Sequence, residues 1–333
     1  MNPILKSCLY YGASRVGELP FFRARLAALR AARAVIIMFH EIQRDCQLEL
    51  MTGTSVSLFE YALNWLHREG WSIVSLDECL EKLASNDRSG RYAVLTFDDG
   101  YRDNVSVALP ILERHNAPFM MYVPTSAPTR TMQSWWLGLR KLFLLRDKVT
   151  IDALGRQFHC SDLRSKISAF TEVTRWIHQD YRRGAMLAPT FKQNGISLAA
   201  LNDEYFLDER ELRTLACHPL ASIGSHTTSH PALATLDSAS ARAELADNRR
   251  YLENLLQLPI RHLAHPYGTL RARGPREEQL ANEAGFQSAA TTQQEQLRDT
   301  KVNHFALPRI GVNSRSDLRA RMSGLVEAAQ ALR

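Results

Sequence analysis

The sequence predicts an α/β fold in which parallel strands form a sheet or barrel, and three observations support this fold class. Strand-like runs alternate with amphipathic helical patterns through the first 123 residues, an order typical of parallel strands joined by helical crossovers. Residues 92–97 are apolar apart from one threonine, as expected of a strand buried on both faces. Polar pairs, His40-Glu41 and Asp98-Asp99, follow two of these runs, where barrels carry functional groups.

The first part of the chain reads as a regular alternation of elements. We expect strands at residues 34–39, 71–74, 92–97 and 118–123. We expect helices at 58–69, from a capping-box pattern at 75–78 onward, and at 103–116. Gly70 suits the end of the first of these helices, and Pro110 kinks or restarts the last.

Residues 125–207 interrupt this alternation with a mostly helical insertion that begins near Trp135-Trp136. The alternation then resumes, with helices expected at 208–216, 238–256, 275–284 and 317–332 and strands at 222–225, 261–264, 286–290 and 306–312. The chain thus divides into an N-terminal helical segment (1–32), a barrel (33–313) and a C-terminal helix (314–333).

Composition limits the classes of function. Of 333 residues, 45% are hydrophobic and 23% charged, which is ordinary for a globular protein, and the net charge is +6. A basic protein suits an acidic glycan, a membrane surface or nucleic acid, but the arginines are scattered and no nucleic-acid motif is present, so we expect no nucleic-acid partner. No obligate protein partner is evident either.

The five cysteines are odd in number and unclustered, which favours free thiols in a reducing compartment. The N-terminus lacks the apolar run of a secretory signal, and no stretch reaches the roughly 20 apolar residues that span a bilayer. We therefore expect a cytoplasmic protein. Residues 1–32 read as a basic amphipathic helix, which either lies peripherally on the inner face of a membrane or packs against the barrel; packing is the favoured reading.

A metal site is predicted from two separated motifs. Asp98 and Asp99 are adjacent carboxylates at the end of a buried strand, where like charges raise one pKa unless a cation lies between them. His226 and His230 are four residues apart, so on one helical turn both imidazoles can face the same point. One carboxylate with two imidazoles is a three-ligand set that leaves a metal open to water. An ordinary Asp-Gly turn is the alternative reading of the first motif.

These residues resemble the motifs of a known family. Thr96-Phe-Asp-Asp-Gly100 resembles the first motif of the polysaccharide deacetylase family (the NodB-homology group, carbohydrate esterase family 4), and His226-Thr-Thr-Ser-His230 resembles its second. Ala264-His-Pro-Tyr-Gly268 resembles the third motif of a branch that reads Ala-x-Pro-Tyr-Gly. The resemblance spans roughly residues 33–313 and implies a distorted (β/α) barrel of the NodB-homology type.

The resemblance also implies roles for individual residues. Asp98 corresponds to the general base and the backbone N–H of Tyr267 to an oxyanion donor. The residues that correspond to metal ligands are Asp99, His226 and His230. The metal is expected to be divalent; zinc is favoured, with Co²⁺, Ni²⁺ and Fe²⁺ as alternatives.

Two departures from the family pattern leave two roles without their usual residue: the group that orients the base and the general acid. Ala264 stands where many members have an arginine that orients the base, and Leu307-Pro308-Arg309 stands where many have Leu-x-His with a general acid. Arg309 is a poor proton donor, so it is expected to orient Asp98 or bind substrate. His40 is the first candidate for the acid and His265 the second, because both follow strands.

The expected function is metal-dependent hydrolysis of an N-acetyl group on a sugar of a polysaccharide, glycolipid or glycan intermediate. An O-acetyl esterase and an inactive carbohydrate-binding relative are the alternatives. Substrate contacts are expected from Tyr101, Trp135 and Trp136, although such aromatic pairs are more often part of a core.

Overall fold

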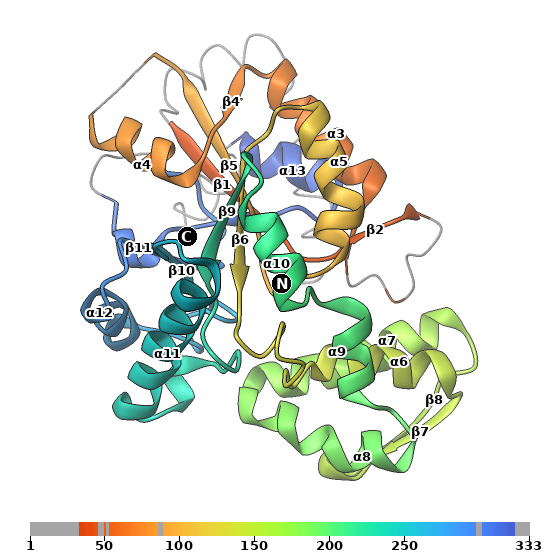
Figure 1. Ribbon diagram of the computed structural model, residues 1–333. Coiled ribbons are helices and arrows are strands. Elements are labelled where there is room, and N and C mark those ends of the chain that lie inside the picture. Colours follow the sequence, from red (N-terminus) through yellow and green to blue (C-terminus); the bar gives the residue numbers. More distant parts are fainter. Residues whose placement is uncertain (1–32, 46–49, 51–52, 86–88, 298–301, 324–333) are drawn as a thin grey trace, which may run out of the picture.

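The computed structural model describes residues 33–45, 50, 53–85, 89–297 and 302–323, and its centre is a curled parallel sheet (Figure 1). The strands pair in the order β11-β10-β9-β6-β5-β1-β12, and β4 pairs with the beginning of β5. Their bounds are β1 Ala34–Phe39, β4 Trp71–Ile73, β5 Arg91–Phe97, β6 Phe119–Val123, β9 Ala221–Ser225, β10 His262–Ala264, β11 Ser288–Ala290 and β12 Ile310–Gly311. The predicted α/β fold class is therefore confirmed.

Alternate residues of the central strands face two different cores, which explains why these strands read as continuous apolar runs. In β1, Val35 and Ile37 pack in the outer core beneath the helices, whereas Ala34 and Ile36 pack in the inner core enclosed by the sheet. β1 and β5 pair in register along their length, from Ala34 opposite Tyr92 to Phe39 opposite Phe97. Both strands therefore end at the same edge, where His40 and Asp98 follow.

Helices cover the outside of the sheet, with α11 and α12 on one flank and α3, α5 and α13 on the other, whereas α4 packs against the inner core (Figure 1). Their bounds are α3 Val56–Arg68, α4 Leu76–Ala84, α5 Leu109–Arg114, α10 Glu209–Ala216, α11 Ser238–Leu256, α12 Pro275–Glu283 and α13 Arg315–Met322. Four of these helices begin at a side chain that accepts a hydrogen bond from an N–H of the first turn. These capping residues are Ser55 for α3, Ser75 for α4, Asp208 for α10 and Asp237 for α11.

Two local differences from the expected elements have clear causes. The helix expected at 103–116 begins as a π-helix at Asn104–Ala108 and continues as α5, in whose first turn Pro110 lies, so the proline restarts the helix. The last strand is shorter than expected: Leu307 bridges Ala290 of β11 and only then does the chain pair with β1, so this segment joins the two edges of the sheet.

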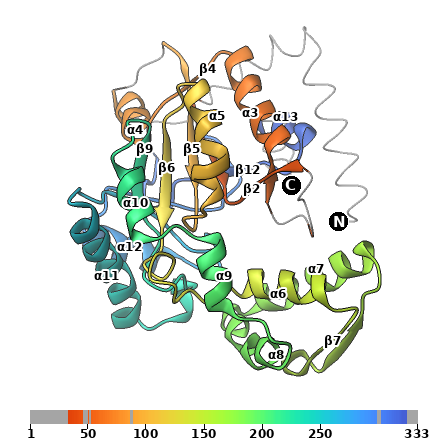
Figure 2. The ribbon, with the colours of Figure 1, turned by 45° about the vertical axis from the view of Figure 1, so that its right-hand side comes forward.

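The insertion contains the helices α6 Trp135–Leu145, α7 Leu163–Gln179, α8 Ala188–Gln193 and α9 Leu198–Tyr205. It also contains an antiparallel hairpin, β7 Lys148–Ile151 with β8 Arg156–His159, that the sequence reading did not anticipate. Figure 2 shows this lobe set off from the sheet, on the side toward which the arrow of β6 points. The insertion therefore borders the edge where the strands end.

Some expectations lie outside the described residues. These are the N-terminal segment 1–32 and the last part of the helix expected at 317–332, of which α13 is the described part. No helix within the described ranges is long and apolar enough to cross a membrane.

Candidate active site

The first half of the site is the turn that follows β5. Asp98 and Asp99 are buried, with 2% and 4% of their surface exposed, and the Asp98 N–H donates to the Phe39 carbonyl at the end of β1. Asp99 and Gly100 both have φ of +73°, a conformation that turns the chain sharply away from the strand. The two carboxylates therefore leave the strand in different directions, although they are adjacent in sequence.

The second half is the loop after β9, and its conformation differs from the expected helical turn. His226–His230 is not helical: Thr227 and His230 have φ of +66° and +60°. The Thr227 hydroxyl accepts a hydrogen bond from the His230 N–H, which closes the loop. The two imidazoles nevertheless converge, with ring centroids 4.9 Å apart. Left-handed backbone at Thr227 and His230, in place of a helical turn, therefore brings the two rings together.

The two halves meet in a group suited to a metal ion. Asp99 Oδ1 lies 3.4 Å from His226 Nε2 and 3.3 Å from His230 Nε2, and this buried oxygen has no hydrogen-bond partner. His226 Nδ1 lies 2.7 Å from the Ala264 carbonyl, so it carries the proton and leaves the Nε2 lone pair toward Asp99. An orphaned carboxylate oxygen facing two imidazoles fits a divalent cation, and it is the one such group of three found in the described part of the chain.

Two residues of α11 hold the histidine loop, and the sequence reading missed both. The Glu244 carboxylate accepts from the N–H groups of Thr228 and Ser229 and from the Ser229 hydroxyl. The Asn248 side chain accepts from the His226 N–H and donates to the Val123 carbonyl of β6. Glu244 and Asn248 are one helical turn apart, so a single face of α11 fixes the loop that carries both histidines.

Arg309 lies against Asp98. Its guanidinium donates to both oxygens of that carboxylate at 2.7 Å, and the arginine is fully buried. Burial raises the pKa of Asp98, but the charge and hydrogen bonds of Arg309, together with the nearby His226 and His40, outweigh burial and hold that pKa below its ordinary value. Of the two uses expected for Arg309, orientation of Asp98 is the one that this geometry favours.

The two candidate acids have different surroundings. His40 is 43% exposed in its side chain, and its Nε2 lies 3.9 Å from Asp98 Oδ2. The amide of Asn104 donates to the His40 carbonyl and fixes the end of β1. His265 is buried, with Nε2 3.4 Å from the Phe305 carbonyl. Burial and the nearby Arg273 charge lower the pKa of His265 to about 3, so it is neutral at ordinary pH and poorly placed to donate.

The three aromatic residues expected to contact substrate differ in accessibility. Trp135 is 6% exposed and donates its indole N–H to the Tyr267 hydroxyl at 3.1 Å. Tyr101 is 2% exposed and its hydroxyl accepts from the Trp136 indole at 2.6 Å. Only Trp136 is partly exposed, and its ring lies 5.3 Å from that of His230. Trp135 and Tyr101 therefore belong to the packing behind the site, and Trp136 lies beside the histidine pair.

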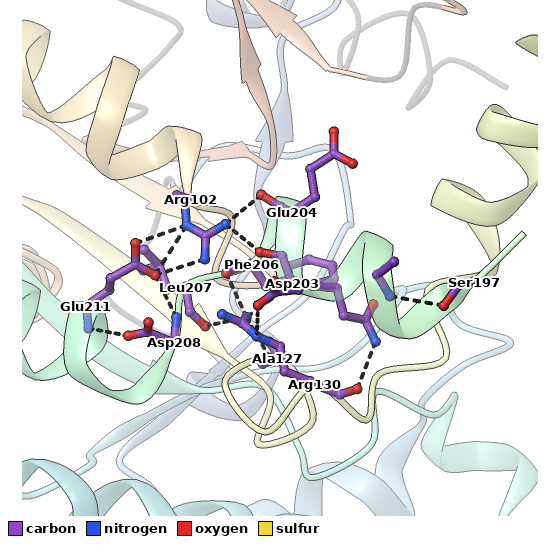
Figure 3. A network of polar contacts seen from close by, with 12 residues as sticks. Arg102, Ala127, Arg130, Ser197, Asp203, Glu204, Phe206, Leu207, Asp208 and Glu211 are labelled. Atoms are coloured by element: carbon purple, nitrogen blue, oxygen red, sulfur yellow. Dashed lines mark hydrogen bonds and ion pairs between the residues drawn. The ribbon is translucent and has the colours of Figure 1, made fainter.

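Two polar clusters, also missed from the sequence, attach the insertion to the barrel. Arg140 of α6 forms a buried bidentate ion pair with Glu41, the residue after His40. Figure 3 shows the second cluster, in which Arg102 bonds Glu211 and the carbonyls of Asp203 and Glu204. Phe206 also bridges Tyr101, directly after the aspartate turn. The insertion is thus fixed to both polar turns that follow β1 and β5.

Arg130 extends the cluster of Figure 3. It donates to the carbonyls of Phe206 and Leu207 and pairs with Asp203. The end of the insertion is consequently held by Arg102, which follows β5, and by Arg130, which lies near the start of the insertion itself.

Comparisons with known proteins agree with this geometry. The sequence profile described as polysaccharide deacetylase matches residues 85–146 and 173–289, more than half of the chain. YxkH of Bacillus subtilis (strain 168), whose name assigns it provisionally to the polysaccharide deacetylases, is 21% identical over 267 residues. That match covers 79% of this chain and 66% of YxkH, so the chain spans slightly less than two thirds of this relative.

Solved structures share the fold. Streptococcus pyogenes deacetylase PplD in complex with acetate is 18% identical with a TM-score of 0.58, and the match covers 87% of this chain and 97% of PplD. IcaB from Ammonifex degensii is 16% identical with a TM-score of 0.55, covering 87% and 96%. Since the matched profile includes the aspartate pair, the histidine pair and the turn at Tyr267, the chain belongs to the polysaccharide deacetylase family.

Proposed function

We propose that this protein is a metal-dependent hydrolase that removes N-acetyl groups from a sugar of a glycan, glycolipid or glycan intermediate. The observation that carries the proposal is the division of labour between two adjacent carboxylates. Asp98 is paired with Arg309, whereas Asp99 Oδ1 faces two imidazoles and has no other partner. A base beside a metal site is an arrangement that supports attack of water on an acetyl group.

Asp99, His226 and His230 would hold the metal. Burial alone raises the pKa of Asp99, yet the facing histidines hold that pKa well below its ordinary value, so the carboxylate is charged and ready to bind a cation. A bound divalent ion, for which zinc is our first choice, acts as a Lewis acid and lowers the pKa of water to about 7.

The protein's own groups supply the proton transfers. Asp98, kept ionised by Arg309, takes the proton of the water that attacks the acetyl carbon. The Tyr267 N–H, which donates to no protein group among the described residues, is available to the oxyanion. The amine that leaves needs a proton, and we assign this role to His40; its accessible ring, 3.9 Å from Asp98, supports the assignment.

The direct test is acetate release by the full chain loaded with Zn²⁺, with metal content measured in parallel. The substrates are matched sugars that carry either an N-acetyl or an O-acetyl group, on soluble and on lipid-linked glycans. Faster release from N-acetyl sugars supports the proposal. Release from O-acetyl sugars alone identifies an esterase, and metal binding without any release identifies a binding protein.

A further inference from the structure

The turn at Tyr267 has an unusual backbone. Tyr267 has φ of +60°, a left-handed conformation that is uncommon for a residue with a large side chain, and Gly268 follows with φ of +59°. Such a conformation persists only where the surroundings hold it. The direction of the Tyr267 N–H depends on this backbone, so whatever holds the turn also aims the proposed oxyanion donor.

Thr292, just after β11, holds one side of the turn. Its hydroxyl donates to the Tyr267 carbonyl at 2.9 Å, and its N–H donates to the Gly268 carbonyl at 3.2 Å. A Cβ on Gly268 would lie 2.5 Å from the Thr292 nitrogen, so the two segments are in close contact. These bonds fix the carbonyl side of Tyr267 and leave its side chain to be held separately.

The insertion holds the side chain. The Trp135 indole N–H donates to the Tyr267 hydroxyl at 3.1 Å, and the Tyr181 ring stacks on the Tyr267 ring with centroids 4.2 Å apart. Tyr181 also shares a hydrogen bond of 2.8 Å with Thr269, two residues beyond Tyr267. Trp135 is itself fixed, because its ring packs closely against Gly184: a Cβ added to that glycine would lie only 2.7 Å from the ring.

We infer that Trp135 is a positioning residue for the reaction, acting through the Tyr267 side chain to aim the Tyr267 N–H at the oxyanion. Its indole N–H is already used and its ring is buried, so it presents no face to a sugar. The insertion therefore completes the reaction centre in addition to bordering it. This inference rests on the proposed function, because it concerns the oxyanion donor of that reaction.

A double-mutant cycle with Trp135→Phe and Tyr267→Phe tests the inference. Both changes keep an aromatic ring, and each removes one partner of the same hydrogen bond. We expect each single variant to lower kcat for a small N-acetyl compound by about fivefold to tenfold, the worth of one hydrogen bond, with KM little changed. The double variant should be no slower than the slower single variant. The inference is wrong if the two reductions in kcat multiply in the double variant, or if the substitutions only raise KM for glycans.

Amide hydrogen exchange gives a readout that does not depend on activity. The Thr292 N–H is bonded to Gly268, so its exchange should quicken in Trp135→Phe, while β5 and β9 stay protected. Trp176→Phe is the matched control: Trp176 packs against the same insertion core, where Arg183 lies over its ring. If Trp135→Phe leaves Thr292 exchange unchanged, or Trp176→Phe changes it equally, the inference fails. A native protein that releases no acetate instead rejects the proposed function.

Discussion

Arg309 and Asp98 are 211 residues apart in the chain, and their side chains meet through two parallel hydrogen bonds of 2.7 Å in a fully buried pair. Arg309 also donates to the Thr291 carbonyl, and the Tyr122 ring lies beneath its guanidinium. The proposed base is thus oriented by a side chain that directly precedes β12, the neighbour of β1, and the charge of that side chain helps to keep the base ionised.

Replacing Arg309 should shift the pH profile in a defined direction. Arg309 lowers the pKa of Asp98, so in Arg309→Met that pKa rises and more of the base is protonated at a given pH. The acidic limb of kcat/KM should move to higher pH, and breaking a buried pair should cost about 3–5 kcal/mol of stability. Arg140→Met breaks the buried pair with Glu41 and is the matched control: it should lose stability without moving that limb. Equal shifts in both would contradict the assignment.

Substitution of the two aspartates should have different effects on zinc content and activity. Asp99→Ala removes a charged ligand, so zinc content and activity should fall together. Asp98→Asn keeps the shape and the three proposed ligands, so zinc should remain while kcat falls by about 10² to 10⁴. The double variant should be little worse than either single one. Elemental analysis beside kcat decides: loss of zinc in Asp98→Asn with retention in Asp99→Ala reverses the roles.

His40 should matter most when the leaving group is poor. An amine must be protonated as it leaves, whereas the phenolate of an activated acetyl ester leaves without help. His40→Gln should therefore slow N-acetyl hydrolysis by about 10² or more and change hydrolysis of p-nitrophenyl acetate far less. His115→Gln, at the end of α5, is the control and should change neither rate. Equal losses on both substrates for His40→Gln would mean that the proton comes from elsewhere.

Trp136 should govern recognition of larger substrates. It is the partly exposed member of the tryptophan pair and lies beside His230. Trp136→Ala should raise KM for a glycan more than for a small acetylated compound, because a sugar ring can pack against the indole face and a compound without such a ring cannot. In the same assays, Trp136→Ala should mainly raise KM, whereas Trp135→Phe should mainly lower kcat. An equal effect of Trp136→Ala on both substrates would remove this role.

The histidine loop should lose metal affinity when its support from α11 is removed. Glu244→Gln keeps the size of the side chain but weakens its three accepted hydrogen bonds. Loss of a residue that supports a metal ligand typically lowers metal affinity by about 10-fold to 100-fold. Calorimetric titration with Zn²⁺ measures the change. Glu253→Gln, farther along α11, is the control and should bind zinc as the native protein does.

Motif spacing and strand composition were enough to predict the sheet and to single out Asp98, Asp99, His226 and His230. The conformation of the histidine loop was not predictable in this way. Thr227 and His230 adopt a left-handed backbone, but neither is a glycine, the residue that would have indicated it. Side-chain direction was the other gap. Whether Arg309 points at Asp98 or outward depends on the short pairing of β12 with β1, which sequence periodicity cannot place.

One missed residue did leave a signal. The buried stripe of α11 contains Ala241, Leu245 and Leu252, and Asn248 interrupts it. A polar residue on an apolar stripe needs a partner, so it indicates a buried hydrogen-bond network. Trp135 left no such signal, because a tryptophan in a helical pattern reads the same whether it packs in a core or faces a ligand.

The bridge between Tyr101 and Phe206 has a consequence for engineering substrate choice in this family. Exchange of the helical lobe alone, from α6 to α9, would cut the Arg102 and Arg130 contacts that hold its end and disturb the backbone next to Asp98 and Asp99. The transplantable unit therefore includes the short segment after Gly100 and the turn at Arg130 as well as the helical lobe. A chimera built on those wider boundaries should keep its catalytic turn intact, and one built on the lobe alone should not.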